Sequence, residues 1–82
     1  MSLQEFDAVI DRMQLAFEYA LNLGQPVEAA KVLYQMNEQL PDDLQLFLDE
    51  PENENAVKSF ISEFNPQIKS AIVEYRHRLM NY

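Results

Sequence analysis

Apolar side chains recur every three or four positions along almost the whole chain, and this period restricts its fold more than any other feature. The 82 residues include one glycine and no threonine, and no stretch alternates apolar with polar residues as a half-buried strand does. A period of three to four residues places apolar side chains on one face of a helix. The sequence therefore predicts an all-α protein, and we expect a single domain over residues 1–82, a small bundle of four to five helices.

The first helix is expected between a capping box and a glycine. Ser2 and Glu5 have the spacing in which each side chain satisfies a backbone N–H at a helix start, and Gly24 suits the position just beyond a helix end. Between them lies an apolar seam with a regular three- and four-residue spacing, formed by Leu3, Phe6, Ile10, Met13 and Phe17. Such a seam suits either packing within one chain or self-association with a second copy, so a homodimer is the open alternative.

A second helix is expected from Pro26, whose missing N–H costs nothing at a first helical position, to about Leu40. Pro41 ends it, because the residue before a proline is disfavoured in the helical conformation. The first two helices should form an antiparallel hairpin.

The segment after the hairpin is acidic. Asp42 and Asp43 suit the first turn of a short third helix, because the helix dipole favours negative charge there. This helix should direct Leu44, Phe47 and Leu48 inward and Leu46 outward. Residues 49–55 contain no apolar side chain to hold them down, apart from a proline, and are predicted to be a mobile acidic connector.

The last segment keeps one apolar phase on both sides of Pro66, in a series formed by Val57, Ile61, Phe64, Ile68, Ala71, Tyr75 and Leu79. Since a proline inside a helix removes a hydrogen bond and clashes one turn back, we expect a kink or break at residues 64–66.

Charge is distributed unevenly. Residues 1–56 carry a net charge of −10 and residues 57–82 a net charge of +2, within a total of −8. Seven acidic residues and no basic residue lie between Lys31 and Lys58. The candidate partner-binding residues are these seven and one tyrosine off the main apolar stripe, namely Glu38, Asp42, Asp43, Asp49, Glu50, Glu52, Glu54 and Tyr34. The alternative interpretation is that the carboxylates only keep the chain in solution.

Several functions are disfavoured by composition. Direct binding to nucleic acid or to an anionic membrane needs clustered Lys and Arg that most of this surface lacks. Residues 49–60 do not match a calcium loop, whose sixth position is Gly where this chain has Glu54, and no cysteine is present for a thiolate metal site, so no metal or cofactor is expected. His77 has no nucleophile or zinc-ligand spacing around it, so no catalytic residue is assigned. No secretory signal is recognised, and we expect a cytoplasmic protein.

Three functional hypotheses follow from these features. The first is a non-enzymatic module, an adaptor or regulator, that binds another protein through its helical surface. The second is an acidic inhibitor or nucleic-acid mimic that binds a basic DNA- or RNA-binding protein. The third is a self-assembling structural subunit that uses the apolar seam of the first helix.

Overall fold

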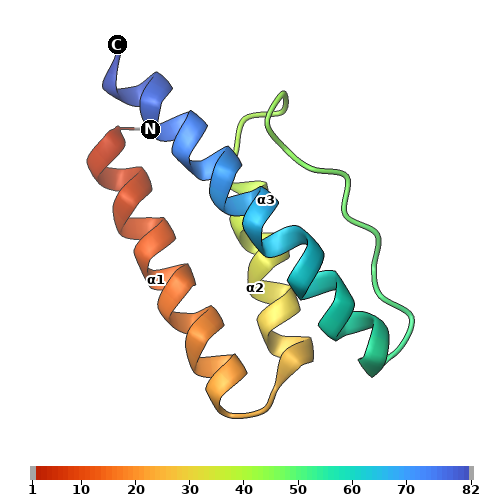
Figure 1. Ribbon diagram of the computed structural model, residues 1–82. Helices are drawn as coiled ribbons and strands as arrows, with labels where there is room; N and C mark the ends of the chain where they lie inside the picture. Colours follow the sequence, from red (N-terminus) through yellow and green to blue (C-terminus); the bar gives the residue numbers. More distant parts are fainter. Residues whose placement is uncertain (1, 82) are drawn as a thin grey trace.

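The structure, a computed structural model, describes residues 2–81. Within this range the chain forms three helices, α1 (Leu3–Asn22), α2 (Pro26–Glu38) and α3 (Glu54–Met80), and no strand. Helices α1 and α2 form an antiparallel hairpin and α3 crosses over it, while the segment between α2 and α3 follows one side of the molecule (Figure 1). The all-α prediction is confirmed, but there are three helices and not the expected four to five.

The start of α1 and the turn between α1 and α2 lie where the sequence predicts them. The Ser2 side chain accepts a hydrogen bond from the Glu5 backbone N–H at 3.1 Å, which caps α1. At the other end Gly24 has φ +70°, and the backbone N–H groups of Gly24 and Gln25 donate to Leu21 and Ala20. These are the two bonds of a Schellman motif, which reverses the chain into Pro26 at the start of α2.

Helix α2 lies at the centre of the core and packs against both other helices. Phe6, Leu33, Met36 and Ile68 are the largest fully buried side chains and come from all three helices. The ring of Phe6 meets that of Tyr75 edge-on, with centroids 4.8 Å apart, and this contact joins α1 to α3 near one end of the molecule.

The seam predicted for self-association is largely used within the chain. Phe6, Ile10 and Phe17 are buried, and Met13 packs partly buried against the same core. Leu3 is half-buried at the start of α1. A second copy cannot reach the three buried side chains unless the fold opens.

The short third helix is not formed. Pro41 accepts hydrogen bonds from the backbone N–H groups of Leu44 and Gln45 in a single turn, and the chain then runs in an extended conformation. An extended chain directs alternate side chains to opposite sides, so Leu46 packs against the core and Phe47 is 88% exposed. The expected orientations of Leu46 and Phe47 are therefore both wrong.

Helix α3 is 27 residues long and is not interrupted at Pro66, so of the kink or break expected at residues 64–66 the break is absent. Pro66 and Ser62 both lie on the exposed side of α3. The carbonyl of Ser62 loses its helical partner at Pro66, but on this side water can take the place of that partner. The residues before and after Pro66 share one apolar phase, which packs both halves of α3 against the same core.

Candidate functional site

Residues 45–53 run beside α3 and include most of the acidic segment that was predicted at residues 49–55. From here on, the name connector refers to residues 45–53. Leu46 and Leu48 pack against the core from alternate positions. The Asn37 side chain, only 9% exposed, donates to the Leu46 carbonyl at 3.0 Å and accepts from the Leu46 N–H at 2.9 Å. Further along, the Tyr34 hydroxyl donates to the Asp49 carbonyl at 2.9 Å. Side chains of α2 thus hold the connector by its backbone, which leaves its carboxylates exposed.

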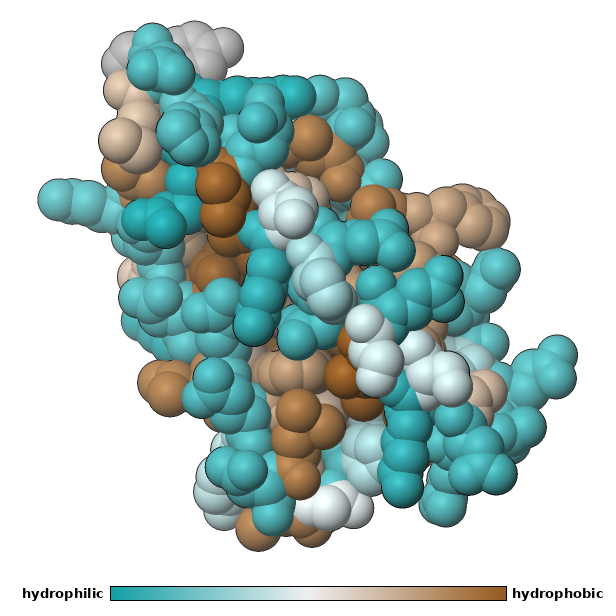
Figure 2. All heavy atoms as spheres, viewed as in Figure 1, coloured by the Kyte–Doolittle hydropathy of each residue, from teal (hydrophilic) through white to brown (hydrophobic). Residues whose placement is uncertain are grey.

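Between the connector and the N-terminal half of α3 lies a surface hollow of about 560 Å³, called here the acidic hollow. Its lining combines three aromatic rings, four carboxylates and three small side chains, namely Phe47, Phe60, Phe64, Asp49, Glu50, Glu52, Glu63, Pro51, Ala56 and Ser59. No basic residue contributes to this lining. Figure 2 shows that the face seen there is mostly hydrophilic, with separate apolar groups between the helices.

The aromatic part of the hollow is fixed by ring contacts. Phe60 stacks on Tyr34, with centroids 5.3 Å apart and planes at 27°, and its centroid lies 4.9 Å from that of Phe64. Phe60 and Phe64 lie one turn apart on α3, so the helix sets their spacing. Phe47 is different, because it is on the connector and projects into solvent.

The carboxylates of the hollow are not neutralised locally. Among the ion pairs of residues 2–81, none involves Asp49, Glu50, Glu52 or Glu63. Their negative potential reaches Tyr34, where burial raises the pKa of the phenol and the charges of Glu50 and Asp49 raise it further.

On the α2 side of the connector a smaller hollow of about 270 Å³ also includes Glu50 and Glu52, but there Lys31 contributes a cation. The Nζ atom of Lys31 lies 3.2 Å from a Glu28 carboxylate oxygen. The acidic hollow is thus the larger of the two and has the less balanced charge.

Of the eight residues predicted to bind a partner, four lie at the acidic hollow and four lie away from it. Asp49, Glu50 and Glu52 line the acidic hollow, and Tyr34 supports it from α2. Glu38, Asp42, Asp43 and Glu54 are exposed but do not line it.

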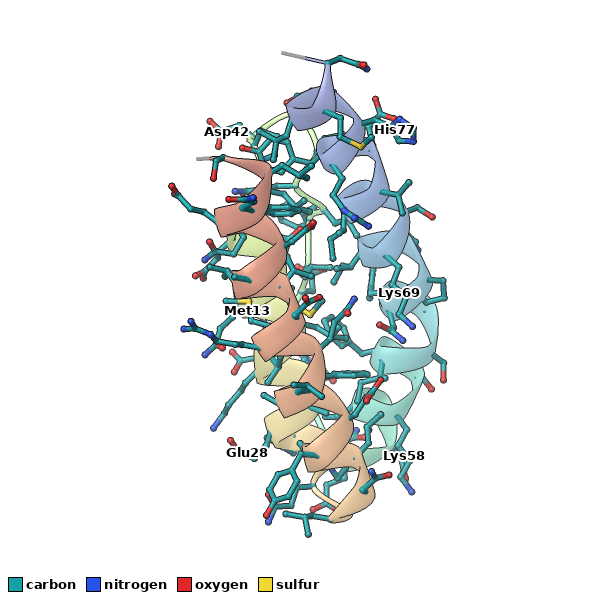
Figure 3. All side chains as sticks on the ribbon, turned by 90° about the vertical axis from the view of Figure 1, so that its left-hand side faces the viewer. Met13, Glu28, Asp42, Lys58, Lys69 and His77 are labelled. Carbon is teal, nitrogen blue, oxygen red and sulfur yellow. The ribbon has the colours of Figure 1, made fainter. Side chains whose placement is uncertain are left out.

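Asp43 has a partner of its own. An oxygen of its carboxylate lies 2.7 Å from an Arg78 guanidinium nitrogen near the end of α3. The hydrogen bond from Arg78 is the main reason that the pKa of the Asp43 carboxyl is lowered. Arg76 pairs with Asp7 of α1 at 2.9 Å, so both arginines near the end of α3 bind acidic side chains within the chain. Asp42 and His77 lie near this end of the molecule in Figure 3.

Sequence reasoning missed the aromatic side of the hollow and Glu63. Phe60 and Phe64 have the four-residue spacing of a helix face, but that spacing alone describes core residues equally well. A helical period predicts that Phe47 belongs to the core, but this segment is not helical. A two-residue period through Leu44, Leu46 and Leu48 would have predicted that Phe47 is exposed.

Comparisons with protein-family models, curated proteins and solved structures give no match for this chain. Across residues 2–81, no group of three or more His, Asp or Glu side chains is arranged to hold a metal ion. No helix in the same range combines the length and the apolar character needed to cross a membrane.

Proposed function

We propose that this chain is a non-enzymatic protein-interaction module that binds a basic segment of a partner protein at the acidic hollow. The observation that carries the proposal is the juxtaposition of four unpaired carboxylates with exposed aromatic surface in one depression. Aromatic anchors surrounded by charge are typical of protein interfaces, where the rings contribute most of the affinity and charge contributes rate and specificity.

Chemistry by the side chains of the hollow has little support. Ser59 is the hydroxyl-bearing residue in the lining, but the histidine nearest in sequence, His77, is 18 positions further along the same helix. At 1.5 Å per residue the two backbones are roughly 27 Å apart, far beyond the reach of a general base. The four carboxylate residues of the lining can also act as bases, but all four are exposed, and none lies in the water-excluded cleft that usually supports such chemistry, so we favour binding over catalysis.

The proposal is tested with two variants that remove the same amount of charge from different places. One carries Glu50→Gln, Glu52→Gln and Glu63→Gln in the hollow, and the control carries Asp11→Asn, Glu18→Gln and Glu38→Gln elsewhere on the surface. Each immobilised variant is exposed to a lysate from about 0.05 to 0.5 M salt, a range in which exposed charges become strongly screened. We expect the wild type and the control to retain the same basic proteins at low salt and the hollow variant to lose them. Equal retention by all three proteins would contradict the proposal.

An alternative function is an acidic inhibitor that covers the nucleic-acid-binding surface of a basic protein. The segment between α2 and α3 follows one side of the molecule (Figure 1), and its acidic residues from Asp42 to Glu54 are exposed, which favours this alternative. Such an inhibitor acts through charge and has no need of the Phe47 ring. If the chain displaces DNA from the captured partner, and Phe47→Ala displaces it equally well, the inhibitor hypothesis is preferred.

A further inference from the structure

The acidic hollow offers an organic cation two kinds of contact in one place. Its lining includes the buried Phe60, the adjacent and partly buried Phe64, and Phe47, a residue that is 88% exposed. The faces of aromatic rings attract cations, and the attraction strengthens where carboxylates lower the cost of removing water from the charge. A volume of about 560 Å³ is within the usual range for a site that holds a small ligand or part of a peptide.

The cations of this chain lie elsewhere. Lys31 is paired with Glu28, Arg76 with Asp7, and Arg78 with Asp43. Arg12 is exposed on α1 and does not line the hollow. Lys58 lines a depression between α3 and the end of α1, and Lys69 lies seven positions before Arg76, on the same side of α3. Figure 3 labels both lysines on α3, in a view in which α1 faces the reader. The charge of the hollow is therefore left for a cation from another molecule.

The chemistry of the lining selects among cations. A hard metal ion needs several oxygen atoms converging on one point, and no such group of side chains occurs within residues 2–81. Between the two cationic side chains, the lysine ammonium is compact and strongly hydrated. The arginine guanidinium is planar, more weakly hydrated, stacks on rings and presents paired N–H groups to a carboxylate. An exposed ring beside carboxylates matches the second set of properties.

We propose that the acidic hollow is a docking site for an arginine side chain of a partner protein, with the guanidinium against the exposed ring of Phe47 and its N–H groups directed to the surrounding carboxylates. This proposal rests on the proposed function and specifies the side chain that the hollow recognises. The Phe47 ring determines the preference for arginine, and the carboxylates determine the general attraction to basic segments.

The test compares two labelled peptides that differ only in the cation, hexa-arginine and hexa-lysine, and measures their dissociation constants by fluorescence anisotropy at moderate salt. Wild-type protein should bind hexa-arginine more tightly. Phe47→Ala should weaken hexa-arginine binding by about two- to fivefold, as expected for an exposed cation–π contact, and leave hexa-lysine binding nearly unchanged. The control is Tyr19→Ala, which removes a ring that is 67% exposed on α1 and should change neither dissociation constant. Because both rings are exposed, both variants should fold, and circular dichroism will check this.

The outcomes separate this proposal from the proposed function. If wild type binds both peptides equally and the Glu50→Gln, Glu52→Gln, Glu63→Gln variant loses both, the arginine site is overturned and the acidic binding surface stands. If Tyr19→Ala weakens hexa-arginine binding as much as Phe47→Ala does, the arginine site is also overturned. If wild type binds neither peptide, both proposals fail.

Discussion

Asn37 shows how one residue determines what a neighbouring segment can do. It is buried in α2, and its amide group donates to the carbonyl and accepts from the N–H of Leu46. These two hydrogen bonds satisfy the backbone N–H and carbonyl of Leu46, as a neighbouring strand would do in a sheet. The connector is kept against the core at this point without placing any of its own charged side chains in the interior.

Asn37→Ala should therefore destabilise the protein by about 1–3 kcal/mol, since it leaves the partly buried N–H and carbonyl of Leu46 without partners. Asn55→Ala, at an exposed position in the first turn of α3, serves as the control and should change stability by less than about 0.5 kcal/mol. Urea denaturation measures both values. Equal effects of the two substitutions would show that the Asn37 hydrogen bonds contribute little.

Asp43 and Arg78 connect the turn after α2 to the end of α3, and the connection should depend on pH. The pKa of Asp43 is lowered in the folded protein, so the contribution of the pair is fully present above the unfolded pKa of about 4 and is lost as the pH falls through the folded pKa. Wild type should be more stable than Asp43→Asn at pH 7 and no more stable at about pH 2.5. Asp42→Asn is the control at the neighbouring exposed position. A stability difference between wild type and Asp43→Asn that persists at low pH would contradict this account.

Among the elements, α3 is unusual because it contains a proline in its interior and supports one wall of the hollow. Its N-terminal half carries Phe60, Glu63 and Phe64 toward the connector, and its C-terminal half binds α1 through Tyr75 and Arg76. Because α3 is continuous through Pro66, one helix connects the acidic hollow to the N-terminal part of α1.

Pro66→Ala should make α3 more stable, because it restores a backbone N–H to the helix and removes the ring clash one turn back. The expected gain in the free energy of unfolding is about 1–3 kcal/mol, measured by thermal and urea denaturation. Ser70→Ala, one turn further along the exposed side, should change it by no more than about 0.5 kcal/mol. A loss of stability in Pro66→Ala would indicate that the proline supports the native path of α3.

The whole molecule is thin, and α3 has acidic side chains on one side and basic side chains on another. Its Cα atoms extend 41 × 23 × 15 Å. Its accessible surface is 5622 Å², somewhat above the roughly 5,100 Å² expected of a compact monomer of this size. Glu63 and the connector make one side of α3 acidic, whereas Lys58 and Arg76 face the direction of α1. With a net charge of −8, the acidic side is under self-repulsion that a basic partner would relieve.

This repulsion predicts that the carboxylates proposed to bind a partner lower the stability of the free protein. The Glu50→Gln, Glu52→Gln, Glu63→Gln variant should melt a few degrees above wild type at low salt, because it removes like charges that have no ion-pair partner. The difference should shrink at about 0.5 M sodium chloride, where these charges are screened. Differential scanning calorimetry at the two salt concentrations measures it, with the Asp11→Asn, Glu18→Gln, Glu38→Gln protein as the control of equal charge. A variant that melts below wild type at low salt would argue that these carboxylates stabilise the fold.

Most of the helical architecture could be predicted from local signals, and most of the hollow could not. Ser2, Gly24 and Pro26 predict the ends of the hairpin because capping depends on a few adjacent backbone groups. Three carboxylates of the hollow follow from the acidic run alone. The helix expected after Asp42 is wrong because a segment this short has little helical stability of its own, and Asn37 and Tyr34 bind its backbone in an extended form instead.

The sequence by itself determined the class of fold, the hairpin and the excess of negative charge, because period, caps and charge are properties of neighbouring residues. Only the tertiary structure decided that α3 continues through Pro66, that Phe47 is exposed, and that Glu63 joins the carboxylates of the connector beside Phe60 and Phe64. These features depend on packing between segments that are distant along the chain. In the connector, contacts with α2 and α3 outweigh the local preference of the chain for a helix. They do so because they bury apolar side chains and also satisfy backbone hydrogen bonds.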